Sequence, residues 1–273
     1  MQILHTVTEE MADPAHGLYR SAISDGVHDE ALDYLNSVTR KTTGTEITLD
    51  AYEGNVVSQI IEEAGKSTDS LIAMTTHGRS GVSPWLMGSV TDTVLHHTKH
   101  PMLISRGHHE GEPEIDTNLD TIIVPLDGSP LAEEVLPHVE ALAIALDLKV
   151  TLLRAAATEE VFSAATGIQR MDGVTGVKYQ DFQEIAHVAG TQAKNYLEEK
   201  QASLRLQGVA TMDHSIIDRS AAQVIVDVAQ ATPNNLVAMT THGRSGPARW
   251  TMGSVTDRVV RRSGDPVLVI RTG

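Results

Sequence analysis

The sequence predicts an α/β fold made of two related units, each a parallel sheet with helices on its faces. Short apolar runs typical of buried strands alternate with amphipathic stretches of helical spacing along most of the chain. In addition, residues 73–92 and 238–257 are nearly identical and align without a gap at an offset of 165 residues. A chain of 273 residues is long enough for two such units, each with its own core.

Composition excludes several classes of function. The net charge of −15 argues against nucleic acid or an anionic membrane as partner, because both require a basic face. Aromatic residues make up 3% of the chain and leave few rings for base stacking. The absence of cysteine excludes disulfides, thiolate metal sites and cysteine nucleophiles. Without a leader-like start or an 18-residue apolar span, a cytoplasmic protein is expected.

The order of the elements follows from the hydrophobic spacing. In the first unit, an irregular stretch runs to about Asp25, and the expected elements are strands over 2–7, 47–52, 71–74 and 101–105 and helices over 28–41, 56–64 and from Ser89. In the second unit they are a strand that runs into a turn over 121–129, strands over 150–154, 209–215, 236–239 and 266–271, and helices over 131–146, 181–207, 221–229 and from Ser254. A polar, acidic segment separates them, so we expect a first domain over 1–107, a linker over 108–118 and a second domain over 119–273.

The repeated stretch has the features of an anion site. In each copy an apolar strand leads through a glycine-rich turn to a Gly-Ser pair that opens a helix, where unpaired N–H groups meet the positive end of the helix dipole. The spacing of Ser89 to Asp92, and of Ser254 to Asp257, is that of a capping box. A purely structural role for the glycines and caps is the alternative, since such turns are common in α/β proteins. The near-identity of the two copies, in a chain whose halves otherwise differ widely, favours the functional interpretation.

These motifs resemble the universal stress protein family, whose ATP-binding members carry a Gly-x-x-Gly-(nine residues)-Gly-Ser/Thr signature. Gly243 followed by Gly253-Ser254, and Gly78 followed by Gly88-Ser89, fit the second part of that signature. The strand over 122–129 and the ending over 266–271 are also similar to the family. The resemblance implies two Rossmann-like units, of the adenine nucleotide alpha hydrolase-like type, with five-stranded parallel sheets.

The resemblance also implies a nucleotide site that holds ATP with Mg²⁺, or another adenine nucleotide, mainly in the second domain. The residues expected to bind it are Pro125, Asp127, Ala155, Met239, Thr240, His242, Gly243, Arg244, Gly253, Ser254 and Val255, with Gly78, Gly88, Ser89 and Val90 in the first domain. Asp127 has a second possible role as a cap of the following helix together with Ser129. Arg244 and its counterpart Arg79 either pair with phosphate oxygens or are solvated. No metal-binding cluster is expected from the His-rich stretch over 96–109.

The first departure from the family is a threonine, Thr75 or Thr240, in place of the first signature glycine. Its side chain either crowds the ribose and phosphates or hydrogen-bonds to them, and the residue type does not decide between these outcomes.

The second departure is that the first unit has no equivalent of the strand, Asp127 and helix that open the second unit, because its matching strand begins at Gln2. Three accounts are open: a start codon placed too late, a truncated sequence, or a strand supplied by a partner chain. We favour an incomplete sequence, which the mass of the native protein tests. The first unit then has a defective adenine site, whereas its phosphate-binding turn persists.

Three functions remain. The first is a nucleotide-binding stress-response or signalling module. The second is a protein-interaction or chaperone-like module without nucleotide, for which Thr240 argues. The third is an enzyme, such as a weak ATPase. We expect no enzyme, because no general-base constellation or Walker lysine accompanies the repeated turn, although slow incidental ATP hydrolysis is compatible with it.

Assembly is expected through the closing strands over 101–105 and 266–271. These strands are apolar and would lie at sheet edges, which partners tend to cover. Family members pair through this strand, so the resemblance implies an intramolecular pseudo-dimer, with a homodimer also possible.

Overall fold

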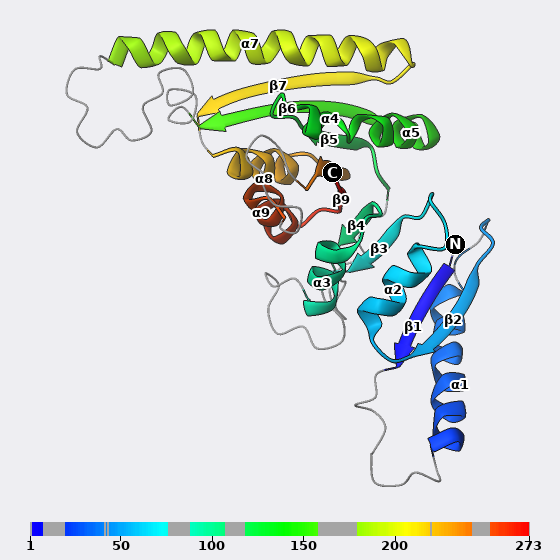
Figure 1. Ribbon diagram of the computed structural model, residues 1–273. Helices are drawn as coiled ribbons and strands as arrows, with labels where there is room; N and C mark the ends of the chain where they lie inside the picture. Colours follow the sequence, from blue (N-terminus) through cyan, green and yellow to red (C-terminus); the bar gives the residue numbers. More distant parts are fainter. Residues whose placement is uncertain are drawn as a thin grey trace, which may run out of the picture. The chain divides into compact units, whose positions relative to one another are not determined.

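Strands and helices alternate along the part of the chain that the computed structural model describes, which comprises residues 2–7, 20–40, 42, 44–75, 88–106, 118–157, 179–218, 220–241 and 252–272. The chain divides into two compact units (Figure 1). The first consists of Met1–Ser70 and Asp92–Thr98, and the second of Leu71–Thr91 and Lys99–Gly273.

The first half of the chain contains seven elements among the described residues. They are β1 (Gln2–Val7), α1 (Arg20–Thr39), β2 (Thr48–Glu53), α2 (Val56–Ala64), β3 (Ile72–Thr75), α3 (Ser89–His97) and β4 (Met102–Ser105). The second half contains β5 (Thr121–Pro125), α4 (Pro130–Glu133), α5 (Leu136–Leu146), β6 (Lys149–Ala157), α7 (Tyr179–Leu206), β7 (Thr211–Asp218), α8 (Ala221–Ala231), β8 (Asn235–Thr240), α9 (Ser254–Arg262) and β9 (Val267–Ile270).

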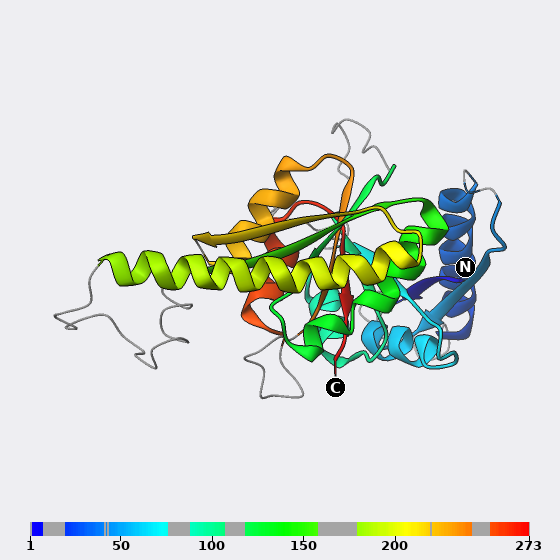
Figure 2. The same ribbon diagram turned by 90° about the horizontal axis from the view of Figure 1, so that it is seen from above.

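The second half forms a five-stranded parallel sheet in the order β9-β8-β5-β6-β7, which confirms the expected architecture of this half. β5 lies at the centre because its sequence, Thr-Ile-Ile-Val-Pro, is an almost continuous apolar run that tolerates burial on both faces. Ile122 and Val124 pack in one cluster with residues of α5 and α7, such as Val139 and Leu197. α8 packs against β6, β8 and α9, so helices cover both faces of the sheet (Figure 2).

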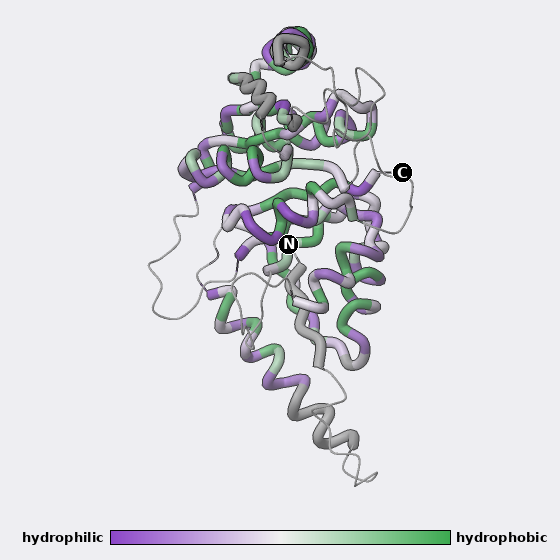
Figure 3. Tube along the Cα trace, turned by 90° about the vertical axis from the view of Figure 1, so that its left-hand side faces the viewer, coloured by the Kyte–Doolittle hydropathy of each residue, from purple (hydrophilic) through white to green (hydrophobic). Residues whose placement is uncertain are grey.

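Helices α2, α8 and α9 are amphipathic. Hydrophilic and hydrophobic residues alternate along their turns (Figure 3), as a helix with one packed and one solvated face requires. In α8, for example, Val224, Ile225 and Ala229 are buried, whereas Gln230 is exposed.

The closing strands of the two halves pair with each other, as predicted. β4 runs antiparallel to β9, with Leu103 opposite Leu268. This pairing extends the five parallel strands to a seven-stranded sheet in the order β3-β4-β9-β8-β5-β6-β7. The apolar edges of both closing strands are thereby covered within the chain.

The strands of the first half do not share one sheet. β1 and β2 form a separate parallel pair, packed against α1 and, through β1, against α2. β3 and β4 form a second parallel pair within the seven-stranded sheet. In the second half the corresponding pairs are β6 with β7 and β8 with β9. β5 joins these two pairs into one sheet, because it lies between β6 and β8. The first half has no counterpart of β5 among the described residues, and its two strand pairs therefore remain separate.

Two predicted helices differ from the structure. The helix expected over 131–146 is interrupted between α4 and α5, because Pro137 has no N–H to donate to the carbonyl of Glu133. α1 begins at Arg20, within the stretch expected to be irregular, so helical structure starts earlier than the apolar spacing indicated.

Within the part of the chain that is described, no helix combines the length and apolar character needed to cross a membrane.

Candidate functional site

Those expected nucleotide-binding residues of the second half that the structure describes lie near one edge of its sheet. β5, β6 and β8 are parallel, so their carboxyl ends meet at the same edge. Pro125 ends β5 and pairs with Leu153, two residues before Ala155 on β6. Met239 and Thr240 end β8. From β5 the chain continues to β6 on one side, whereas β8 flanks β5 on the other, which makes this edge a topological switch point, where α/β sheets bind ligands.

The turn after β5 holds Asp127 in a fixed orientation. The N–H of Leu126 donates to the carbonyl of Leu153 at 2.8 Å, which ties the turn to β6. Asp127 Oδ1 accepts a hydrogen bond from the N–H of Ser129 at 2.8 Å. Ser129, and not Asp127, caps the next helix, because its Oγ accepts from the N–H of Ala132 at 3.2 Å. Helix capping, one of the two roles considered for Asp127, is therefore performed by Ser129.

Gly128 gives this turn its shape. Its φ of +84° lies in the left-handed region, which side chains disfavour. A Cβ atom added here would lie 3.0 Å from Arg154 Nη1, so the guanidinium group lies directly against the glycine.

A polar cluster that the sequence did not predict packs against this turn through Arg154. Arg154 lies over the ring of Tyr196, 5.0 Å from its centroid, and the Tyr196 hydroxyl donates to Glu133 Oε1 at 2.9 Å. Lys200 Nζ lies 2.9 Å from Glu133 Oε2. Burial, followed by the hydrogen bond to Glu133, raises the pKa of Tyr196 far above its ordinary value. The cluster joins two helices, since Glu133 belongs to α4 and both Tyr196 and Lys200 belong to α7. Their spacing in the sequence does not predict this contact.

The N-terminus of α9 adjoins the end of β8. The N–H of Gly253 donates to the carbonyl of Thr241 at 2.8 Å, and the N–H of Thr241 donates to the carbonyl of Ile270 at 2.9 Å. The first helical hydrogen bond runs from the N–H of Asp257 to the carbonyl of Gly253 at 3.0 Å. The N–H groups of the three preceding residues, Ser254 to Thr256, thus belong to the open first turn, where an anion is favoured.

The capping box predicted for this helix is wrong. Gly253 is the N-cap and supplies no side chain, Ser254 is the first helical residue and is exposed, and the Asp257 carboxylate accepts from Arg261 Nε at 2.7 Å. The arginine one turn later competes successfully for the carboxylate, because a charged donor binds it more strongly than a backbone N–H. The serine hydroxyl consequently remains at the helix N-terminus and is not used for capping.

Thr240, which replaces the signature glycine, is buried in the structure, with 6% of its surface exposed. Its carbonyl oxygen accepts a hydrogen bond from Thr256 Oγ1 at 2.9 Å. Thr240 is thus largely shielded from solvent. Met239 is likewise buried, and Pro125 and Ala155 are partly exposed.

The first half repeats part of this arrangement. Thr91 Oγ1 donates to the carbonyl of Thr75 at 2.8 Å, in the positions that correspond to Thr256 and Thr240. Gly88, Ser89 and Val90 begin α3 as their counterparts begin α9. The remaining predicted site residues, Gly78, His242, Gly243 and Arg244, lie outside the residues that the structure describes, as do Arg79 and residues 107–117 of the expected linker region.

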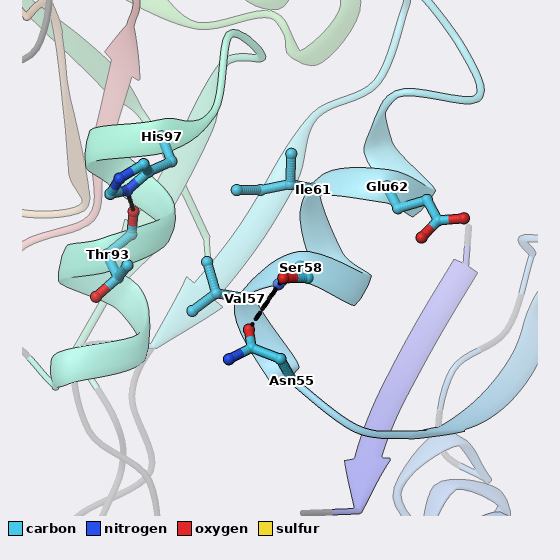
Figure 4. A pocket seen from close by; sticks show the side chains of 7 residues that line it. All are labelled: Asn55, Val57, Ser58, Ile61, Glu62, Thr93 and His97. Carbon is cyan, nitrogen blue, oxygen red and sulfur yellow. Dashed lines mark hydrogen bonds between the residues drawn. The ribbon is translucent and has the colours of Figure 1, made fainter.

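The described residues do not bring potential metal ligands together. They contain no cluster of three or more His, Cys, Asp or Glu side chains that could hold a metal ion. A hollow in the first unit is lined by Asn55, Val57, Ser58, Ile61, Glu62, Thr93 and His97 (Figure 4). Asn55 Oδ1 accepts from the N–H of Ser58 at 3.0 Å, and His97 Nδ1 lies 2.8 Å from the carbonyl of Thr93. These polar groups bond within their own helical segments, and none of the predicted site residues lines the hollow.

Comparisons with known proteins agree with this architecture. A sequence model described as the universal stress protein family matches residues 2–106 and 118–271. The chain is 27% identical over 156 residues to universal stress protein MJ0577 of Methanocaldococcus jannaschii, which covers 55% of this chain and 93% of that protein. It is 31% identical over 93 residues to universal stress protein MJ0531 of the same organism, covering 33% of this chain and 54% of that protein.

Among solved structures, a universal stress protein from Archaeoglobus fulgidus has a TM-score of 0.61 at 20% identity, covering 100% of this chain and 85% of that chain. A putative universal stress protein from Pseudomonas aeruginosa has a TM-score of 0.60 at 15% identity, covering 99% and 92%. These likenesses show the fold, and the family match covers nearly the whole chain in two segments. The chain belongs to the universal stress protein family.

Proposed function

We propose that this protein is an adenine-nucleotide-binding stress-response or signalling module that holds ATP with Mg²⁺ in its second half. The observation that carries the proposal is the convergence of the Asp127 turn and the α9 N-terminus on the carboxyl edge of β5, β6 and β8. In this proposal Asp127 contacts the ribose side, Ala155 contacts the adenine, and Gly253, Ser254 and Val255 hold the phosphates.

The chemistry of the described residues fits such a ligand. The open first turn of α9 offers backbone N–H groups to phosphate oxygens, and Ser254 adds an exposed hydroxyl. Gly253 leaves room for a close approach of the backbone. Thr240 is buried, which supports the view that its side chain does not obstruct the phosphates. Bound Mg²⁺ would neutralise part of the phosphate charge.

In this proposal the protein binds nucleotide without being an enzyme, and it acts in the cytoplasm. It also includes a division into domains over 1–107 and 119–273, joined by a linker. The first half keeps the helix N-terminus at Gly88 and Ser89 but lacks, among its described residues, a counterpart of β5 and Asp127. One nucleotide site per chain follows from this difference.

The test is isothermal titration of the purified chain with ATP, with and without Mg²⁺, using Gly253→Val and the matched variant Gly88→Val. Gly253 has φ −62° and ψ 145°, a conformation that any residue adopts, so valine probes the space beside the backbone and not its conformation. We expect one site per chain, lost in Gly253→Val and kept in Gly88→Val.

Other outcomes would redirect the proposal. Loss of the site in Gly88→Val alone would assign binding to the first half. Two sites would mean that the first half binds without its own counterpart of Asp127. An absence of binding at millimolar ATP would contradict the proposal and favour a protein-interaction module.

A further inference from the structure

Arg154 of β6 contacts both the Asp127 turn and α7. Its guanidinium group fills the space beside Gly128, where an added Cβ atom would lie 3.0 Å from Nη1 and 3.2 Å from Cζ and Nη2. The same group lies over the ring of Tyr196, with Cζ 5.0 Å from the ring centroid, which is within the range of a cation–π interaction. The backbone next to Asp127 is thus packed against a side chain that α7 supports.

Glu133 and Lys200 hold Tyr196 in place. The Tyr196 hydroxyl donates to Glu133 Oε1 at 2.9 Å, and Lys200 Nζ lies 2.9 Å from Glu133 Oε2 and 5.4 Å from the Tyr196 ring centroid. Glu133 is the last residue of α4, the short helix that Ser129 caps. The turn therefore meets α7 through two connections, one through Arg154 and one along α4.

Arg154 and Ala155, the expected adenine contact, point to opposite faces of the sheet, because successive side chains of a strand alternate. Arg154 shares its face with Leu152, which packs in one cluster with Leu197 of α7. The contact of Arg154 with Tyr196 of the same helix agrees with this assignment. We therefore expect any effect of Arg154 on a ligand beside Ala155 to pass through the turn.

The charges of Arg154 and Asp127 act on one hydroxyl group. Burial and the hydrogen bond to Glu133 are the main reasons for the raised pKa of Tyr196. The positive charge of Arg154 lowers this pKa, whereas the negative charge of Asp127 raises it, so both charges lie near the hydroxyl. A nearby guanidinium group attracts the Asp127 carboxylate, whose Oδ1 also accepts from the N–H of Ser129 at 2.8 Å. The orientation of the carboxylate thus depends on Arg154.

We propose that Arg154 is a positioning residue of the nucleotide site, which holds the Asp127 turn in the shape that lets the carboxylate bind a ribose hydroxyl. This inference rests on the proposed function, in which Asp127 contacts the ribose side. Arg154 then determines how strongly the site distinguishes a ribonucleotide from a nucleotide without that hydroxyl. Loss of the guanidinium group weakens the contact to the hydroxyl, whereas the contacts of the phosphates with the N-terminus of α9 remain.

The experiment measures the affinities of ATP, 2′-deoxyATP and 3′-deoxyATP by isothermal titration of the full chain and of Arg154→Met. Methionine keeps an unbranched side chain and removes the guanidinium group. We expect the wild type to bind ATP about tenfold or more tightly than at least one deoxy nucleotide, because a hydrogen bond to a charged group is strong. In Arg154→Met this affinity ratio should fall by about threefold or more, as for residues of one interacting network.

Arg205→Met is the matched control. Arg205 lies in the last turn of α7, where Nε donates to Thr211 Oγ1 at 2.8 Å and Nη2 donates to Gln201 Oε1 at 3.1 Å. Thr211 begins β7, which runs parallel to β6, so this contact lies toward the opposite end of the sheet from the turn. The control removes the same charge and should leave the affinity ratio unchanged.

A double-variant cycle shows whether Arg154 acts through Asp127. In the Asp127→Ala background, Arg154→Met should leave the affinity ratio unchanged, because the carboxylate that Arg154 positions is missing. Should Arg154→Met melt at a markedly lower temperature, Arg154→Lys replaces it, since lysine keeps the charge without the planar group.

Hydrogen exchange of the free protein gives a readout that needs no nucleotide. The N–H of Ser129 donates to Asp127 Oδ1, so it should exchange faster in Arg154→Met than in the wild type or in Arg205→Met. Unchanged exchange at Ser129 would contradict the positioning role. An absence of ATP binding in the wild type would contradict the proposed function, and with it this inference, so the two failures are distinguishable.

Four further results would overturn the proposal. They are equal affinities of the wild type for ATP and both deoxy nucleotides, a ratio that Arg154→Met leaves unchanged, an equal fall of the ratio in Arg205→Met, and a fall that persists in the Asp127→Ala background. Weaker ATP binding at an unchanged ratio would instead assign Arg154 to the charge of the phosphates.

Discussion

The Oγ1 hydroxyl of Thr256 donates a hydrogen bond to the main-chain carbonyl oxygen of Thr240, 2.9 Å away. It joins the first turn of α9 to the last residue of β8. Thr91 and Thr75 make the same contact at 2.8 Å in the first half. The contact has thus been kept in both copies, and it fixes a helix N-terminus beside a strand end wherever the repeated stretch occurs.

Replacing Thr256 with valine should weaken both the fold and the proposed ATP site. Valine has nearly the same shape but no hydroxyl, so the free energy of unfolding should fall by about 1–2 kcal/mol, as measured in urea. ATP affinity should also fall, because the N–H groups of the first turn lose their fixed position.

Thr256→Ser is the control that keeps the hydroxyl and should retain ATP affinity. Thr91→Val removes the matched contact in the first half and should leave ATP binding unchanged. Equal affinity in Thr256→Val and the wild-type protein would show that this hydrogen bond does not position the site.

Gly128→Ala should destabilise the turn after β5 through its backbone. At φ +84° a side chain costs about 1–2 kcal/mol, and the added Cβ atom would also press against Arg154. The free energy of unfolding measures the loss. A Cβ atom added at Gly190, within α7, would meet no neighbouring side chain or element within 4 Å, so Gly190→Ala should stabilise the protein by up to about 1 kcal/mol.

The double variant Gly128→Ala, Arg154→Ala separates the two causes. If backbone conformation dominates, glycine and alanine at position 128 differ as much in the Arg154→Ala background as in the wild type. A difference that vanishes in this background would identify the arginine contact as the cause instead.

The sequence could predict the regular part of this molecule. Apolar runs identified the strands, and the repeat identified matching strand ends at residues such as Thr75 and Thr240. The pairing of the closing strands was also predictable, because an apolar edge such as Met102–Ser105 needs a cover.

Side-chain contacts between distant helices were not predictable. Glu133 and Tyr196 are 63 residues apart, and only the packing of α7 against the sheet brings them together. The capping box failed because the Asp257 carboxylate has a stronger partner in Arg261, and local spacing does not rank competing donors. The break at Pro137 was readable from the proline, but the Ala- and Leu-rich sequence around it favoured a single helix.

Tyr196 should make the stability of the protein sensitive to high pH. Burial and the bond to Glu133 raise its pKa above the ordinary 10.0, so the folded state keeps the proton that the unfolded chain loses. Its contribution is complete below pH 10 and is lost as pH rises further. Tyr196→Phe should cost about 1 kcal/mol near pH 8 and should show a shallower fall in Tm between pH 9 and pH 11. Parallel falls in the two proteins would contradict this account.

Asn235 should stabilise the end of α8. Its side chain is 2% exposed, and Nδ2 donates to the carbonyl oxygens of Ala229 at 2.9 Å and Thr232 at 2.8 Å. Asn235→Ala leaves both carbonyls without this donor and should cost about 1–3 kcal/mol of unfolding free energy. The buried Oδ1 atom of Asn235 has no hydrogen-bond partner among the described residues. Because the substitution also removes this unsatisfied acceptor, the loss of unfolding free energy should lie toward the lower end of that range.

The matched position in the first half is Ser70, whose hydroxyl donates to the carbonyl of Ser67 at 3.2 Å in an exposed setting. Ser70→Ala should therefore cost less than about 0.5 kcal/mol, because water replaces the lost bond. Urea unfolding of both variants measures the difference. A larger loss for Ser70→Ala than for Asn235→Ala would show that burial does not set the strength of this repeated contact.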